Sequence, residues 1–558
     1  MVRKIFGFLY QETNSLNQAA LLLGLFAFLS QLLAFLRDRL LAHIFGAGAE
    51  LDIYYAAFRI PDFLFVTVAS IVSISVLIPF IVEKETLGRE VLREMINSIF
   101  TFFGLLMFVV AAVSYVYMPW LSHILFKGMP ESQIVEIIFL SRVLLLSPIL
   151  LGLSNLFGSL TQAYNRFTIY ALAPILYNAG IVVGIIVFGE KWGILGVVAG
   201  VIFGAALHLV VQVPFVMKSG LLPKVTTKVD WPLLYRVVTT SLPRTLTLSM
   251  SSIVLIFLVS FASRMVEGSI SVLSFATNMQ SVPLALIGVS YSLAAFPTLT
   301  RKFQEKNIDA FVEQMQNTSR FIIFWSLPLT ALFVVLRAQV VRVLLGSGLF
   351  DWSATRLTAA AVALFTLSAV FQSLLLLFMR GFYSAGFTRK PFFINLFSTG
   401  VLVVTTYGLV KWFYASEAFR LFISSMMKVE DLPGSVVLML PLGFTLGMIV
   451  NGVLLWVFFE REFKGFSRGV TRTLFEGLGA SFIMGLVAYV GLQVFAGFFD
   501  LDTLPGIFLQ GLFSGLLAII SGAVVLIALK SQELKSVWQV LRGKFWRAEV
   551  IASDPEIV

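Results

Sequence analysis

Three arginines stand inside or at the end of long apolar runs, where a charged side chain is costly. Arg142 lies within the run 139–144, Arg244 directly follows Pro243, and Arg37 ends an apolar run that begins near residue 17. An arginine at the centre of a membrane helix costs about 2.5–3.5 kcal/mol on insertion scales, so such a residue usually faces a cavity or another charge. The chemistry indicated is anion binding, because each charge-assisted hydrogen bond contributes about 1.5–3 kcal/mol.

Each arginine also has a purely structural interpretation. Arg142 and Arg244 could extend their guanidinium groups to a membrane interface, as long basic side chains near helix ends do. The deeper position of Arg142 favours a cavity, whereas Arg244, one turn into its helix, fits either interpretation. Arg37 could be an interfacial anchor that pairs with Asp38.

Four further polar residues lie in the same kind of segment. Asp52 and Arg59, seven residues apart, are expected to pair across one side of a helix, as a structural ion pair near the outer surface or as part of a gate. Asn178 and Asn395 are expected to form interhelical hydrogen bonds rather than to bind a ligand.

The elements that must position these residues are apolar runs long enough to cross a bilayer. About 20 apolar residues span the ~30 Å hydrocarbon core as a helix. With 58% hydrophobic and 13% charged residues, the composition excludes an ordinary soluble globule. We therefore predict an all-α polytopic membrane protein with about 14 transmembrane helices, over residues 17–37, 53–82, 94–119, 133–163, 169–189, 193–216, 238–263, 269–298, 318–345, 355–385, 391–412, 434–459, 472–499 and 507–529.

The basic residues predict the orientation of these helices. With a cytoplasmic N-terminus, 26 Lys and Arg fall in inside segments and 10 in outside segments, as the positive-inside rule requires. Both termini are therefore expected to be cytoplasmic. The net charge of +10 is explained by this topology and by attraction to anionic membrane lipids, so it indicates no nucleic-acid partner.

Residues that recur at offsets of 217–220 indicate a duplication. They pair Pro174 with Pro391, Asn178 with Asn395, Tyr164 with Tyr383, Phe167 with Phe387, and Pro79 with Pro297. An even number of spans per copy gives two parallel-repeat six-helix lobes, followed by two C-terminal helices. The predicted organisation is an interfacial segment 1–16, an N-lobe 17–216, a cytoplasmic linker 217–237, a C-lobe 238–459, two further helices 460–529 and an amphipathic cytoplasmic tail 530–558.

Several classes of site are disfavoured by the composition. The chain has no cysteine and three histidines, so we expect neither a metal site nor a cofactor. A membrane enzyme acting on lipid-linked sugars needs paired acids on a sizeable external loop. The longest external connection, 413–433, is short and holds only Glu417, Glu430 and Asp431 as acids, so we expect no enzyme activity.

Several short motifs together are typical of one family. They are 35–38 (FLRD), 44–48 (IFGAG), Asp52, 58–61 (FRIP), 165–167 (NRF) with Ala173, Pro174 and Asn178, and 380–383 (RGFY) with 388–391 (TRKP). These stretches resemble those of the MurJ (MviN) lipid II flippases of the multidrug/oligosaccharidyl-lipid/polysaccharide exporter superfamily, and the resemblance extends over nearly the whole chain.

The family resemblance implies a cationic central cavity that holds the substrate's pyrophosphate. The arginine expected before Asp38 is kept as Arg37. Three other expected arginines fall on Gln31, Phe65 and Asn278, and an expected acid falls on Ser70. A cavity that has lost three cations binds a dianionic headgroup less well, so another embedded arginine is expected to compensate.

The predicted function is outward flipping of a polyprenyl-diphosphate-linked cell-wall precursor, similar to lipid II, by alternating access in the bacterial cytoplasmic (inner) membrane. This would serve peptidoglycan synthesis and cell shape, with cell-wall synthesis proteins as possible partners. The predicted substrate-binding residues are Arg37, Asp52, Arg59, Arg142, Arg244, Gln31 and Asn278. The alternatives are a flippase for another lipid-linked oligosaccharide, a transport-inactive scaffold and, less favoured, a drug or cation antiporter.

The energy source is the least defined part of the prediction. Spans seven to twelve hold no obvious embedded acid, so the sodium site described for some family members has little support here. An outward-moving anion instead gains about 2.3 kcal/mol per charge and 100 mV from an inside-negative potential. Glu476 in span thirteen is expected to pair with Arg472 near the helix end.

Overall fold

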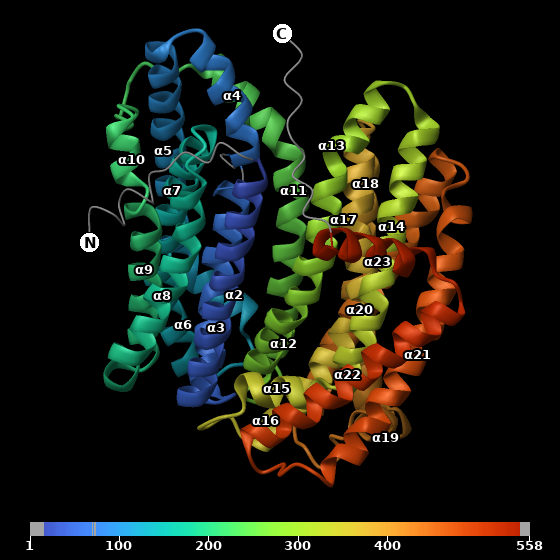
Figure 1. Cartoon of the computed structure of the whole chain (residues 1–558). Helices are drawn as coiled ribbons and strands as arrows, with labels where there is room; N and C mark the ends of the chain where they lie inside the picture. The colour runs from blue at the N-terminus through green and yellow to red at the C-terminus, as the bar shows by residue number, and fades with distance from the viewer. Residues whose placement is uncertain (1–15, 70, 72–73, 547–558) are drawn as a thin grey trace. The chain divides into compact units, whose positions relative to one another are not determined.

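The computed structural model describes the chain except for residues 1–15, 70, 72–73 and 547–558, and all regular structure in the described residues is helical (Figure 1). The predicted segment 1–16 thus lies outside the described residues apart from Leu16, and the tail 530–558 is described up to Trp546. The helices up to residue 262 are α2 Leu16–Phe45, α3 Ala49–Leu64, η1 Phe65–Ala69, α4 Ile74–Thr86, α5 Arg89–Leu125, α6 Glu131–Leu144, α7 Leu146–Ala163, α8 Phe167–Trp192, α9 Ile194–Val210, α10 Val213–Lys218 and α11 Trp231–Ala262. The later helices are α12 Ser269–Pro283, η3 Leu284–Val289, α13 Ser290–Gln304, α14 Ile308–Val335, α15 Arg337–Leu345, α16 Trp352–Thr366, α17 Ala369–Ser384, α18 Arg389–Ala415, α19 Glu417–Met427, η4 Ser435–Leu438, α20 Met439–Glu462, α21 Phe466–Ala496, α22 Leu504–Ala528 and α23 Gln532–Trp546.

The length and apolarity of these helices confirm the predicted fold class. Ten helical segments in the described residues are long and apolar enough to cross a membrane, or eleven if α16 and α17, which meet at a 41° bend, form one span. The three other predicted spans, 17–37, 53–82 and 238–263, coincide with α2, with α3 to α4, and with α11. The protein is an all-α polytopic membrane protein, and the count of fourteen spans stays a prediction.

The regular α-helical pattern of the long second, fourth and eighth spans is interrupted near their internal prolines. Pro148 has no N–H to donate to the carbonyl of Leu144, and α6 ends at that residue. Pro61 is followed four residues later by the π-helix η1, and Pro283 is followed directly by the π-helix η3. The two π-helices start 219 residues apart (284 − 65), within the range of the sequence repeat.

Contacts divide the chain into two compact units that differ from the predicted lobes. The first unit comprises Met1–Ala276, Leu344–Ala361 and Asn395–Phe444, and the second comprises Thr277–Val343, Val362–Ile394 and Thr445–Val558. The first unit therefore includes parts of the predicted C-lobe. The lobe boundaries inferred from the repeat stay a prediction.

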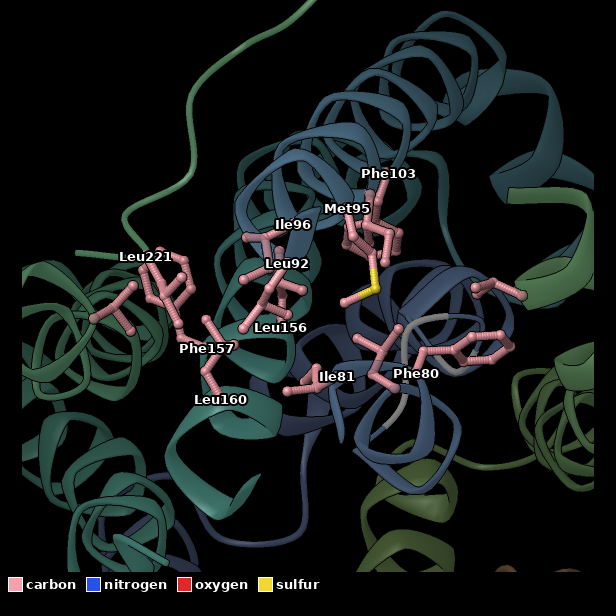
Figure 2. Packing of buried hydrophobic residues seen from close by; sticks show 14 of the residues in the cluster. Phe80, Ile81, Leu92, Met95, Ile96, Phe103, Leu156, Phe157, Leu160 and Leu221 are labelled. Carbon is pink, nitrogen blue, oxygen red and sulfur yellow. The ribbon is translucent and has the colours of Figure 1, made fainter. Parts of the chain in front are cut away.

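A cluster of buried apolar side chains joins α4, α5 and α7 in the first unit (Figure 2). Phe80 and Ile81 of α4, Phe103 of α5, and Leu156 and Phe157 of α7 all lie in it. Lipid tails are as apolar as these side chains, so close van der Waals packing, rather than transfer out of water, holds such helices together in a membrane.

Helices α8 and α9 pack at backbone contact through glycines spaced four residues apart. A Cβ atom built on Gly180 would lie 2.4 Å from Gly204 Cα, and one built on Gly184 would lie 2.4 Å from Gly200 Cα. Small residues at this spacing let membrane helices approach closely. The sequence therefore brings α8, which carries Asn178, against its neighbour with no side chain between them.

We expect Gly184→Ala to lower the melting temperature in detergent, because the new methyl group must separate α8 from α9. The matched control is Gly104→Ala in α5, where a Cβ atom meets nothing within 4 Å. Both changes raise intrinsic helix propensity by about 1 kcal/mol, so the difference between them isolates the steric cost. Equal melting temperatures for the two variants would contradict the close packing.

A buried ion pair attaches the amphipathic helix α23 to the second unit. Arg320 Nε of α14 lies 2.5 Å from Glu533 Oε1, and the Glu533 side chain is only 2% exposed. Thr473 and Ser531 also donate to this carboxylate, at 2.8 and 2.9 Å. Burial alone would raise the pKa of Glu533, but these hydrogen bonds outweigh it and lower the pKa below its ordinary value.

We expect Glu533→Gln to release α23, because removing one partner of a buried pair typically costs about 3–5 kcal/mol. Limited proteolysis should then cleave the chain near residue 530 faster than in the wild type, whereas the exposed control Lys535→Gln should behave as the wild type. Because the pKa of Glu533 is lowered, its contribution is complete above the unfolded pKa of about 4.3 and is lost as the pH falls through the lower folded pKa. Resistance of the Glu533→Gln variant to cleavage would rule out this attachment.

Candidate functional site

Arg37 is held in α2 by an acid on its own helix and an amide on α8. Its Nε and Nη2 donate to Asp38 Oδ1 at 2.9 and 2.7 Å, and its Nη1 donates to Asn178 Oδ1 at 3.2 Å. Asn178 also donates to Ser30 Oγ at 3.2 Å, which confirms its predicted interhelical bonding. These bonds use three of the five N–H donors of the guanidinium, and the side chain is 21% exposed. Two N–H groups thus have no protein acceptor among the described residues.

Arg59 and Asp62 extend this charged cluster along α3. Arg59 Nε donates to Tyr55 O at 3.0 Å, and its Nη2 donates to Ser274 Oγ at 3.5 Å. Asp62 is exposed and interacts electrostatically with Arg59 and Arg37. The sequence analysis missed Asp62, although the cost of embedding a charge singles it out as it does the arginines.

Asp52 caps the start of α12 and makes no pair with Arg59, so that predicted pairing is wrong. Its Oδ2 accepts from Gly268 N at 2.7 Å, and its Oδ1 accepts from Ser271 N at 2.7 Å and from Ser271 Oγ at 2.6 Å. The first N–H groups of a helix lack intrahelical acceptors and carry positive partial charge, so they hold a carboxylate more readily than a distant arginine does.

The loops around Asp52 make further contacts within the first unit. Glu267 Oε1 accepts from Ala49 N at 3.0 Å, and Leu349 N donates to His43 O at 2.9 Å. Gly268 has φ +87°, and a Cβ atom there would lie 2.3 Å from Ala47 O. We call these contacts, with those of Asp52, the α3–α12 junction. It joins the connections that precede α3, α12 and α16.

Arg142 contacts Tyr115 rather than Arg37 or the residues that bind Arg37. Its Nε donates to Tyr115 O of α5 at 3.0 Å, and its guanidinium carbon lies 4.4 Å from the centre of the Tyr115 ring. Val135 and Phe139, on the same face of α6, are 57% and 53% exposed. These contacts fit the interfacial interpretation, and a cavity role for Arg142 stays a prediction.

The remaining predicted site residues have less defined roles. Arg244 lies in α11, but its side chain is outside the described part of the structure, as is Ser70. Gln31 is half-buried in α2, Asn278 is half-buried in α12, and Phe65 is the first residue of η1. Their place in a substrate path stays a prediction.

The predictions for Glu476 and Asn395, which lie outside the Arg37 cluster, differ in outcome. Glu476 Oε1 accepts from Arg472 Nε at 2.6 Å, which confirms the predicted helix-end pair. Asn395 is buried in α18, and its interhelical bonding stays a prediction. No group of three or more His, Cys, Asp or Glu side chains in the described residues could hold a metal ion.

A large apolar cavity lies within the second unit. Its volume is about 1160 Å³. Four helices line it: α14 contributes Leu327 and Val334, α17 contributes Phe371, α20 contributes Trp456, and α21 contributes Phe482. This volume exceeds the roughly 300–1,000 Å³ of ordinary small-ligand pockets, so the cavity suits a long, flexible apolar chain.

The helical fold is that of a multi-pass, all-α membrane transporter. A solved multidrug resistance MATE family transporter of the MOP superfamily, in an inward-facing conformation, aligns with a TM-score of 0.62 at 15% identity, over 78% of this chain and 96% of that chain. A solved lipid II flippase MurJ, in an inward closed conformation, aligns with a TM-score of 0.71 at 21% identity, over 91% of this chain and 100% of that chain.

The chain belongs to the lipid II flippase MurJ family, whose sequence profile matches residues 41–509. Among its relatives, the probable lipid II flippase MurJ of Buchnera aphidicola subsp. Schizaphis graminum is 27% identical over 402 residues, which cover 70% of this chain and 77% of the relative. The probable lipid II flippase MurJ of Rickettsia prowazekii is 23% identical over 399 residues, covering 71% of this chain and 78% of the relative. The family resemblance inferred from the short motifs is confirmed, and the protein is a multi-pass bacterial membrane protein.

Proposed function

We propose that the protein flips a polyprenyl-diphosphate-linked cell-wall precursor, of the lipid II type, from the inner to the outer leaflet of the cytoplasmic membrane by alternating access. No covalent step is involved, so it acts as a transporter and not as an enzyme. Its relatives carry the name of lipid II flippases, and this relationship supports the choice of cargo.

Arg37 is the observation that carries the proposal. A diphosphate in a low-dielectric cavity needs positive charge, because an unpaired buried anion costs several kcal/mol. Arg37 is fixed by Asp38 and Asn178 yet retains two N–H donors and partial exposure. A guanidinium pre-positioned in this way can bind a phosphate without first being ordered.

The apolar cavity of the second unit supports the lipid character of the cargo. Its lining by α14, α17, α20 and α21 is suited to the polyprenyl chain, since the side chains named above are all hydrocarbon or aromatic. With both termini in the cytoplasm, an inside-negative potential drives the anionic headgroup outward. Gln31 can supply neutral hydrogen bonds where the family resemblance led us to expect an arginine.

Transport by reconstituted protein tests the proposal. Liposomes containing the protein, with an inside-negative potential, should move fluorescent lipid II faster than protein-free liposomes. A second lipid-linked sugar of the capsule type, tested in parallel, measures cargo selectivity. If neither lipid moves faster than in protein-free liposomes, the protein is a transport-inactive scaffold.

A further inference from the structure

Asp62 occupies an unusual position for an acid in a membrane helix. It directly follows Pro61 in α3 and lies three positions after Arg59, so the two side chains share a face of the helix. It lies about 14 Å along the helix from the start of the predicted span at residue 53. The side chain is nevertheless exposed, and it interacts electrostatically with both Arg59 and Arg37.

The neighbouring acids Asp38 and Asp52 are held by hydrogen bonds, whereas the Asp62 carboxylate is not. Asp38 is only 7% exposed and accepts two hydrogen bonds from Arg37. Asp52 is buried and accepts three hydrogen bonds at the start of α12. The hydrogen bonds of the described residues do not include one to the Asp62 carboxylate, so this side chain can change position without breaking a bond.

The charges of this cluster cancel. Arg37 and Arg59 contribute two positive charges, and Asp38 and Asp62 contribute two negative charges when ionised. A diphosphate that approaches Arg37 therefore meets a site with no net positive charge, and it must displace Asp62 or tolerate its repulsion. Such a cluster binds its anion less tightly than the two arginines alone would.

We infer that Asp62 is a built-in counter-anion, which competes with the diphosphate group of the cargo for Arg37 and Arg59 and thereby sets the affinity for anionic headgroups. The inference rests on the proposed function. It assigns Asp62 a specificity-determining role: its negative charge offsets the positive charges of Arg59 and Arg37 in the empty protein and repels the diphosphate group of the cargo. This competition prevents the embedded arginines from retaining the anion and so favours release of the cargo.

Binding of farnesyl diphosphate, a short water-soluble analogue, to the full-length protein in detergent tests this role. Asp62→Asn keeps the size of the side chain and removes its charge, and we expect it to tighten binding about tenfold, equivalent to ~1.4 kcal/mol. The gain should be smaller for farnesyl monophosphate and absent for farnesol, because only a charged headgroup competes. Asp62→Glu should bind as the wild type does.

The matched control is Glu90→Gln, since Glu90 pairs with Arg93 at the same three-residue spacing on an exposed helix end. It should leave every affinity unchanged. Weaker or unchanged diphosphate binding by Asp62→Asn, or an equal gain for farnesol, would overturn the counter-anion role while leaving the flippase proposal intact. If no variant binds farnesyl diphosphate, the diphosphate site itself is refuted and both proposals fall.

Discussion

Replacing Arg37 with glutamine is expected to reduce lipid II transport at least about hundredfold. The change removes the charge and both free donors, and two charge-assisted hydrogen bonds contribute roughly 3–6 kcal/mol. It also removes the guanidinium that pairs with Asp38, whose side chain is 7% exposed. Initial flipping rates in liposomes, together with the melting temperature, measure the two effects separately.

A second variant separates binding from stability at this position. Arg37→Lys keeps the charge beside Asp38 but loses the planar guanidinium, so it should fold normally and still transport poorly. Arg356→Gln is the control for lost charge, since Arg356 pairs with Asp431 in an exposed region. Normal transport by Arg37→Gln would remove this residue from the cargo path.

The variant Arg142→Gln tests whether Arg142 lies in the cargo path, which stays a prediction. A loss of transport that matches Arg37→Gln assigns Arg142 to the cargo path. If transport is normal, Arg142 has only the structural role of contacting Tyr115 of α5 from the exposed face of α6.

Asp52→Ala is expected to cause the second large effect, a loss of both stability and transport. Three hydrogen bonds disappear, and the N–H groups of Gly268 and Ser271 lose their acceptor. Each bond to a charged group contributes about 1.5–3 kcal/mol, so the α3–α12 junction should open readily. Labelling of a cysteine introduced at Ser269, which is only 2% exposed at the start of α12, in a chain that has no native cysteine, measures this opening.

Ser271→Ala provides the graded control for the junction. It removes only the hydroxyl donor and leaves both backbone donors on the carboxylate, so its effect should be a fraction of that of Asp52→Ala. Wild-type labelling and transport by Asp52→Ala would show that the junction contributes neither to stability nor to the transport cycle.

Hydrophobic run length predicted most of the helical architecture. The break between α6 and α7 lies just before Pro148, and the π-helices η1 and η3 begin soon after Pro61 and Pro283, because proline lacks the N–H that a regular helix needs. These are local effects. The two compact units were not predictable in this way, because they depend on which distant segments pack together.

Ion pairs within one helical turn were predictable from the sequence, whereas the distant partners of Asp52 were not. Arg37 with Asp38, and Glu476 with Arg472, pair within one helical turn. Asp52 instead binds backbone groups 216 and 219 residues away, and spacing on its own helix gives no information about them. Asp62 was overlooked, although it lies in an apolar segment only three positions after Arg59.

The π-helices η1 and η3 have a consequence for how insertions and deletions accumulate in this protein. A π-turn holds one residue more than an α-turn, so a helix can gain a residue there while both of its ends stay in place. Elsewhere in the helix, the same insertion would rotate every following side chain by about 100°. Lineages related to this protein should therefore gain or lose single residues at 65–69 and 284–289 more often than in the flanking α-helices. Alignments that force these segments to be gapless will misplace the residues that follow by one position.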